Sequence, residues 1–280
     1  MNPRIKTGSR AIKQIRNFAL GAISTCVVAM TPMASQAANI QLGFILDESG
    51  SISASEWNII RQGLASAINL IPVGGPDSYY LSIVTFGDNA VIRTGFANTA
   101  VTAANRASLS NAVANFTQNM GATNYEAAFK VMDSALGSSN DFDFSYVNFA
   151  TDGEPNACGS PNQTSAPGLA GSQACAIAGK TQLVNSGVDN ISIEGIGVSP
   201  ANAAFLQNSI CYPGPCDTTV PFNFPTQGFY IGVANAAAYA AAVQNKIRIV
   251  TGQVPEPGTL ALLGLALLAG LGFQQRRRSA

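Results

Sequence analysis

An apolar run leads directly into a polar loop in the segment Ile40-Gln41-Leu42-Gly43-Phe44-Ile45-Leu46-Asp47-Glu48-Ser49-Gly50-Ser51. The apolar part has the length and composition of a buried strand. One carboxylate and two hydroxyls then follow at alternate positions, on Asp47, Ser49 and Ser51. Because such hard oxygen ligands suit Mg²⁺, Mn²⁺ or Ca²⁺ rather than zinc, we predict a divalent-cation site at the end of this strand.

Two later segments offer oxygen atoms that would complete the metal shell. Thr123 supplies a hydroxyl within residues 121–124, and Asp152 supplies a second carboxylate just beyond an apolar strand that ends at Ala150. The alternative for the first segment alone is a turn that leads into a helix, with Ser55 as the N-cap. Thr123 and Asp152, in the right order and context, favour the metal site.

With these three segments the chain resembles the von Willebrand factor type A (vWA) domain, over roughly residues 39–252. In that family the pattern forms the metal-ion-dependent adhesion site (MIDAS), where many ligands bind through a carboxylate. The resemblance implies a cation, Mg²⁺ first and Mn²⁺ or Ca²⁺ as alternatives, held directly or through water by Asp47, Ser49, Ser51, Thr123 and Asp152. Glu48 and Asn124 flank these residues, and we expect them to tune the site or to orient its waters.

Residues 1–37 have the features of a secretory signal peptide, which signal peptidase would remove. Five basic residues between Arg4 and Arg16 precede a short apolar region, residues 18–30. Ser35-Gln36-Ala37 then places small residues at positions −3 and −1 of a cleavage site. We expect cleavage after Ala37 or Ala38, and therefore export of the chain.

Residues 254–280 form a second processing signal. Pro255-Glu256-Pro257 precedes an almost wholly apolar stretch, residues 259–273, and the arginines at 276–278. The stretch is shorter than the ~20 residues of a comfortable span, so a transient anchor is favoured over an ordinary tail anchor. The arrangement resembles the PEP-CTERM sorting signal. That resemblance implies a Gram-negative bacterium, a transient inner-membrane stage, cleavage by an exosortase, and release to the cell surface or to the exopolysaccharide matrix of a biofilm.

The segment between the two signals is acidic. It holds seven of the fifteen basic residues and fourteen of the fifteen acidic ones, so its formal net charge is about −7; with Glu256 of the sorting signal, the chain without the leader and the arginine tail carries about −8. Without a basic patch to neutralise phosphates, nucleic-acid binding is disfavoured. An acidic surface suits solubility outside the cell and a role for divalent cations.

Four cysteines remain once Cys26 leaves with the leader, and an even number suits an oxidising compartment. They are Cys158, Cys175, Cys211 and Cys216. The last two enclose a tight loop of turn residues, so we favour Cys211–Cys216 together with Cys158–Cys175 among the three possible pairings. A tetrathiolate zinc site is the alternative, although the spacings suit it poorly.

Strand and helix patterns alternate between the signals. We predict strands at 40–46, 79–86, 90–96, 144–150, within 188–198, and at 229–233, and helices at 56–71, 106–116, 125–136, 174–186, 200–210 and 236–249. This order predicts a doubly wound α/β fold of the vWA or Rossmann-like kind, with a mostly parallel sheet, one antiparallel edge strand and helices on both faces. Residues 154–172 and 211–227 read as loops added to a minimal vWA domain.

The chain contains no histidine, which excludes Ser-His-Asp and Cys-His nucleophile systems and a His-ligated catalytic zinc. We therefore expect a non-enzymatic, secreted binding or adhesion domain. A carboxylate on a protein or an acidic polysaccharide would complete its metal shell. The alternatives are a structural matrix protein with a stabilising metal, and a metal-assisted hydrolase, for which no general base beyond the ligands stands out.

Overall fold

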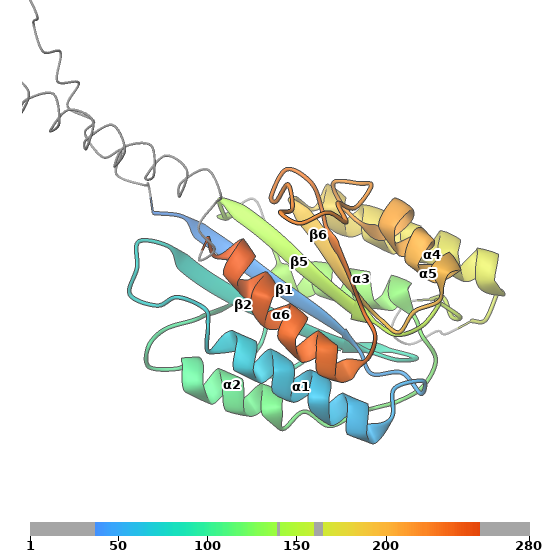
Figure 1. Ribbon diagram of the computed structural model, residues 1–280, viewed down its shortest axis with the longest axis horizontal. Helices are drawn as coiled ribbons and strands as arrows, with labels where there is room; N and C mark the ends of the chain where they lie inside the picture. The colour runs from blue at the N-terminus through green and yellow to red at the C-terminus, as the bar shows by residue number, and fades with distance from the viewer. Residues whose placement is uncertain (1–36, 139–140, 160–164, 253–280) are drawn as a thin grey trace, which may run out of the picture. The chain divides into compact units, whose positions relative to one another are not determined.

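A computed structural model describes residues 37–138, 141–159 and 165–252. The described residues form one mixed sheet between two layers of helices (Figure 1). Almost all of the predicted signal peptide and the whole predicted sorting signal, with its apolar stretch 259–273, lie outside the described residues. Among the helices that are described, none has the length and apolar character needed to cross a membrane.

The sheet has the strand order β3-β2-β1-β5-β6-β7, and its five longest strands run parallel to one another. These are β1 (Asn39–Asp47), β2 (Ser78–Phe86), β5 (Phe144–Thr151), β6 (Asn190–Ile196) and β7 (Tyr230–Val233). The central strands are buried on both faces, which explains their continuous apolar runs. The doubly wound fold predicted from the sequence is confirmed.

The antiparallel edge is shorter and more broken than predicted. The expected strand at 90–96 ends early, as β3 (Ala90–Ile92), and a second short strand, β4 (Thr99–Ala100), also pairs with β2. Gly95 has a φ of +81° and Asn98 a φ of +49° between them. Because such left-handed residues cannot continue a strand, the edge divides in two at this turn.

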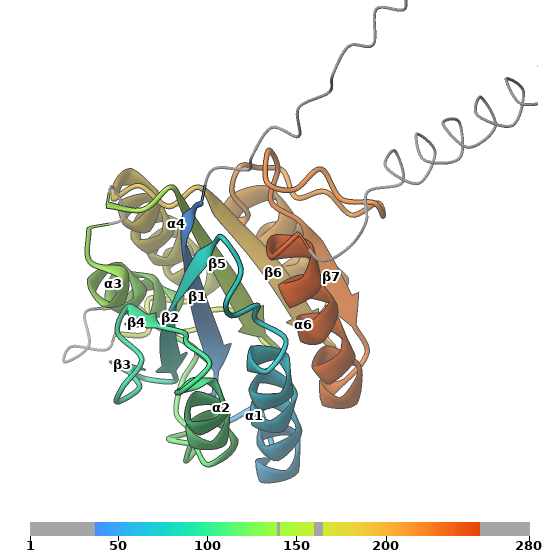
Figure 2. The same cartoon turned by 90° about the vertical axis from the view of Figure 1, so that its left-hand side faces the viewer.

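One helical layer consists of α1 (Ala54–Ile68), α2 (Arg106–Ala114) and α6 (Ala236–Val250), which share one apolar core with a face of the sheet. The other consists of α3 (Tyr125–Leu136), α4 (Leu169–Asn185), α5 (Pro200–Phe205) and the π-helical turn η2 (Leu206–Ile210). Figure 2 shows the two layers on opposite sides of the sheet. Ser53, rather than Ser55, is the N-cap of α1, where it forms a capping box with Glu56.

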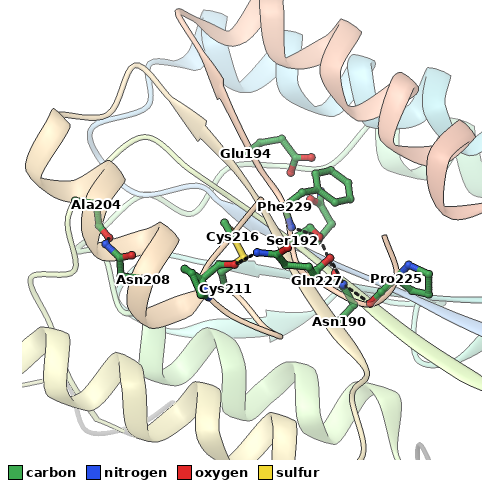
Figure 3. Close-up of a disulfide and its surroundings, with 12 residues drawn as sticks. Asn190, Ser192, Glu194, Ala204, Asn208, Cys211, Cys216, Pro225, Gln227 and Phe229 are labelled. Carbon is green, nitrogen blue, oxygen red and sulfur yellow. Dashed lines mark hydrogen bonds between the residues drawn. A yellow bond between two sulfur atoms is a disulfide. The ribbon is translucent and has the colours of Figure 1, made fainter. Parts of the chain in front are cut away.

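Two disulfides tie down the loops that the sequence marks as additions. Cys158 bonds to Cys175 and thereby joins the loop after β5 to α4. Cys211 bonds to Cys216 just after η2, as Figure 3 shows. This is the pairing favoured from the sequence, and it leaves no free thiolates for the tetrathiolate zinc alternative.

Close packing between α1 and α6 generates a stability prediction. A Cβ built on Gly63 would lie 2.7 Å from both Cα and Cβ of Ala240. We expect Gly63→Ala to lower the free energy of unfolding by about 1–3 kcal/mol through overpacking, although alanine favours a helix by about 1 kcal/mol. Thermal unfolding measures the change. Ser66→Ala, on the exposed side of α1, is the control, and an unchanged Tm for Gly63→Ala would contradict the contact.

Candidate metal centre

The predicted ligands Asp47 and Asp152 follow two strands that are neighbours in the sheet. β1 pairs in parallel with β5 from Ile40 opposite Phe144 to Leu46 opposite Ala150. The carboxyl ends of parallel strands meet at one edge, which is where ligands bind in open α/β sheets. The topology therefore brings both carboxylates to the same edge.

Asp47 is fixed in place by groups on both strands. The backbone N–H of Ser49 donates to its Oδ1 at 2.9 Å, and the hydroxyl of Thr151 donates to its Oδ2 at 2.7 Å. The Thr151 hydroxyl also contacts the Tyr125 hydroxyl at 2.9 Å, and Tyr125 donates to the carbonyl of Gly153 at 2.5 Å. Asp47 is only 2% exposed, so these donors hold a carboxylate that has left water almost completely.

A chain of hydroxyls joins the first predicted segment to the third. Ser49 Oγ lies 3.0 Å from Ser51 Oγ, and the Ser51 hydroxyl donates to Asp152 Oδ1 at 2.8 Å. Ser49 is buried, whereas Ser51 is exposed and Asp152 is partly exposed. The array of oxygen atoms thus runs from the interior at Asp47 to the surface at Ser51.

Thr123 is held beside this array by backbone contacts. Gly50 N–H donates to the carbonyl of Gly121 at 2.8 Å, which joins the loop after β1 to the loop before α3. Asn156 bridges the Thr123 backbone, because its Oδ1 accepts from the N–H at 2.8 Å and its own N–H donates to the carbonyl at 3.0 Å. A Cβ built on Gly153 would lie 3.8 Å from both Ser51 Oγ and Thr123 Oγ1. Both hydroxyls therefore lie close to this glycine.

A pocket opens over these hydroxyls. The loop after β5 and the start of α4 form one wall, and the other wall carries the predicted ligands Ser51 and Thr123. The whole lining is Gly50, Ser51, Gly121, Thr123, Gly153, Glu154, Pro155, Asn156, Ala166, Gly168 and Leu169. The inserted segment 154–172 thus shapes the surface next to the candidate metal centre.

Glu48 faces away from the predicted ligands. Its carboxylate is 1% exposed and pairs with the Arg93 guanidinium at 2.6 Å. It also accepts from the Thr85 hydroxyl at 2.8 Å and from the Asn119 N–H at 3.0 Å. That Glu48 tunes the site or orients its waters stays a prediction; its partners also hold β2 and the loop before Thr123 beside the site.

Asn124 has a similar positioning role. Its side chain accepts from the N–H of Ala127 and so caps α3, and its amide donates to the carbonyls of Asp88 at 3.1 Å and Gly159 at 3.3 Å. These contacts fix the backbone next to Thr123. Thr151, Tyr125 and Asn156 were not predicted from the sequence; only the position of Thr151 beside Asp152 signals a role.

Burial gives the two carboxylates unusual acidities. Removal from water raises the pKa of Asp47 from 3.8 to about 7, and the nearby charge of Asp152 adds to the rise. Burial also raises the pKa of Asp152. A divalent cation between them would favour both ionised forms. Hydroxyls and carboxylates as the only donors fit a hard cation, so Asp47, Ser49, Ser51, Thr123 and Asp152 are suited to hold one.

A second grouping of potential ligands lies elsewhere. Glu126, Cys158 and Cys175 offer atoms within 4.8 Å of one another. The two sulfurs are bonded to each other in a disulfide and so provide no thiolate for a metal. The oxygen array at the ends of β1 and β5 is the better candidate.

Sequence profiles identify two parts of the chain. The profile of the von Willebrand factor type A domain matches residues 41–218, and that of the PEP-CTERM protein-sorting motif matches residues 253–278. The chain belongs to the von Willebrand factor type A domain family. Domains of this family often bind a divalent metal, and the sorting motif indicates export, association with the cell surface and processing by an exosortase. A search of curated protein sequences gives no match.

Several solved structures share the fold. Proximal thread matrix protein 1 from the mussel byssus, with a zinc-occupied MIDAS motif, has a TM-score of 0.54 at 15% identity, over 78% of this chain and 47% of that one. The PilB minor pilin from Streptococcus sanguinis has a TM-score of 0.54 at 17% identity, over 79% and 63%. The pilus adhesin SpaC from Lactobacillus rhamnosus GG has a TM-score of 0.54 at 13% identity, over 78% and 30%. This chain therefore spans less than two thirds of each.

The buried Asp47 predicts a pH dependence of stability in the metal-free protein. Its pKa of about 7 exceeds the unfolded value of 3.8, so the folded state keeps a proton that the unfolded chain releases. The stability from this proton is fully present below about pH 4 and is lost as the pH rises through about 7. With chelator present, we expect Asp47→Asn to reduce the fall in Tm between about pH 5 and pH 8. 

The control is Asp141→Asn, an exposed acid before the other end of β5, which should keep the wild-type slope. Equal slopes for wild type and Asp47→Asn would show that Asp47 does not titrate in this range.

Proposed function

We propose that this protein is an exported, divalent-cation-dependent binding domain that mediates adhesion at the bacterial surface or in an exopolysaccharide matrix. The cation, Mg²⁺ first, is held by the five predicted ligands, and a carboxylate of the binding partner completes its shell. The observation that carries the proposal is the oxygen array that links Asp47, Ser49, Ser51 and Asp152 beneath an open pocket.

The oxygen array runs from buried residues to an exposed one, and this supports ligand binding as well as metal binding. Asp47 and Ser49 are buried and occupied by protein partners, whereas Ser51 is exposed at the rim. A cation held at the rim keeps a coordination position toward the pocket. Because some of the two carboxylates and three hydroxyls act through water, the cation stays incompletely neutralised, and an outer carboxylate can supply a further hard oxygen.

Because the domain is acidic, an acidic partner would need the cation in order to bind. The segment between the signals carries about −7, and Glu154 lines the pocket. A carboxylate-bearing protein or a polyuronic acid would be repelled without the metal. Binding therefore has to disappear when the cation is removed.

The names of the solved structures that share the fold are consistent with this proposal. They include a pilus adhesin, a minor pilin and a thread matrix protein. The absence of histidine supports binding without turnover. A structural matrix role, in which the metal only stiffens the loops, is the second candidate, and the ligand experiment below separates the two.

We further propose three parts for the chain: a signal peptide at 1–37, the vWA domain at 39–252 and the sorting signal at 254–280. A Gram-negative producer, a transient inner-membrane stage and exosortase cleavage follow from the sorting motif at 253–278.

Metal binding tests the site directly. Calorimetry should show one Mg²⁺ or Mn²⁺ site per chain, which Asp47→Ala abolishes because it removes the buried carboxylate. Thr123→Val keeps the side-chain shape but removes the hydroxyl, and it should weaken binding roughly 10–100-fold. Asp141→Ala, an exposed acid elsewhere on the chain, should bind as the wild type does. Equal affinity for Asp47→Ala and wild type would refute the assignment.

Ligand binding tests the function with polygalacturonate as the probe and its methyl ester as the control. We expect retention on the free polyuronate with Mg²⁺, and none with chelator, on the ester or for Asp47→Ala. Metal binding without any carboxylate-dependent retention would favour the structural role. Degradation of the polymer would indicate a hydrolase.

Processing at the C-terminus is tested separately. Prolines flank Glu256, and because proline disfavours a helix we propose that a protease can cut there. Mass spectrometry of the surface fraction should find a C-terminus close to Pro257. Replacement of Pro255, Glu256 and Pro257 by alanine should leave the chain in the inner membrane, while Gln253→Ala should be exported normally. A surface form that retains the arginines at 276–278 would overturn this proposal.

A further inference from the structure

A lysine lies inside the protein, far in sequence from the metal centre. Lys246, on α6, is 3% exposed. Its Nζ donates to Oδ1 of Asn148 on β5 and lies 3.2 Å from Oε1 of Glu194 on β6. The Phe229 ring centroid is 4.9 Å from the same nitrogen. Figure 3 shows the Glu194 carboxyl beside this ring.

The surrounding polar groups are poorly satisfied. Within the described part of the chain, the hydroxyl of Tyr239 is buried without a hydrogen-bond partner, and the Glu194 carboxyl group has only Lys246 and the Asn148 side chain as polar partners. Asn148 is 3% exposed, and Glu194 and Tyr239 are fully buried. A buried ion pair with unmet hydrogen bonds is a poor source of stability, so the group calls for another explanation.

The arrangement brings together the three groups that an amide-forming reaction needs: an amine, an amide carbonyl and a carboxyl group. Lys246 supplies an amine at the side-chain carbonyl of Asn148, and Glu194 supplies a carboxyl group next to the amine. Neighbouring strands and the helix packed on them hold these groups without water, as a proximity effect requires. We propose that Lys246 and Asn148 become joined by an intramolecular isopeptide bond, with Glu194 as the general acid and base.

The reaction balances without an oxidant or a cofactor. Nζ of neutral Lys246 attacks Cγ of Asn148, the carbonyl electron pair moves to Oδ1, and Oδ1 takes the proton of the Glu194 carboxyl. Glu194 then removes a proton from Nζ and passes it to Nδ2. The Cγ–Nδ2 bond breaks with its electrons on nitrogen, ammonia leaves, and the proton on Oδ1 returns to Glu194 as the carbonyl re-forms.

The acidities of the two charged partners suit this sequence. Burial lowers the pKa of Lys246 from 10.5 to about 8, which increases the fraction of neutral amine. Burial raises the pKa of Glu194, and Lys246 only partly offsets that rise, so the carboxyl group is better able to hold a proton. A small cavity, lined mostly by apolar groups, has both Asn148 and Lys246 in its lining.

The bond would connect the last helix to the strand that carries the metal centre. α6 ends at Val250, shortly before the sorting motif at 253–278. β5 ends at Thr151, next to Asp152. Tension applied between a bound ligand and the C-terminal end would then pass through a covalent link, and α6 would not peel from the sheet. The bond itself depends only on the interior groups and does not require the proposed function.

Mass spectrometry of the reduced, exported protein tests the proposal. We expect the wild-type chain to be lighter than its calculated mass by one ammonia molecule, and a digest to contain a branched peptide that joins Asn148 to Lys246. Glu194→Gln keeps the shape but removes the acid, and it should have its full calculated mass. Lys246→Arg should also have its full mass.

Asn148→Asp is a chemical control, because attack on a carboxyl group releases water instead of ammonia. It should show either the loss of one water molecule or the full mass, and never the loss of ammonia. Wild-type protein at its full calculated mass, with separate peptides for Asn148 and Lys246, would overturn the proposal and leave an ordinary buried ion pair. Unchanged ammonia loss in Glu194→Gln would overturn the role of Glu194.

Discussion

The parallel pairing of β1 with β5 is the constraint on which the candidate site depends. It places Asp47 and Asp152 at one edge of the sheet, and it lets Thr151 of β5 donate directly to the Asp47 carboxylate at the end of β1. Burial raises the pKa of both carboxylates, and the charge of Asp152 adds to the rise at Asp47. A divalent cation held as we propose would favour both ionised forms, and Ser51 and Thr123 lie on the loops at this edge.

The sequence predicts this arrangement well because its signals are local. Strand ends can be found from apolar runs, and the order of strands and helices implies which ends meet, so the positions of Asp47 and Asp152 follow. The direction of Glu48 was not predictable, because its buried partner, Arg93, lies on a different part of the fold. The region before α4 reads as a loop from its glycines and prolines, yet the helix begins at Leu169, directly after Gly168 with a φ of +79°.

The buried polar group around Lys246, unlike the candidate metal centre, could not be predicted from the sequence. Asn148, Glu194 and Lys246 come from three elements separated by about fifty residues each, and none stands in a motif. Only the register of β5 with β6 and the packing of α6 bring them together. The same strand, β5, thus carries a polar cluster in the interior and leads directly to the predicted metal ligand Asp152.

The central claim is that one cation lies at the junction of the three loops. Anomalous diffraction from crystals grown with Mn²⁺ tests it most directly. The account predicts a single strong peak within coordination distance of the hydroxyls of Ser49, Ser51 and Thr123, with Asp47 and Asp152 bonded directly or through water. A peak only at other acidic side chains, or none at a concentration that saturates binding in solution, would contradict it.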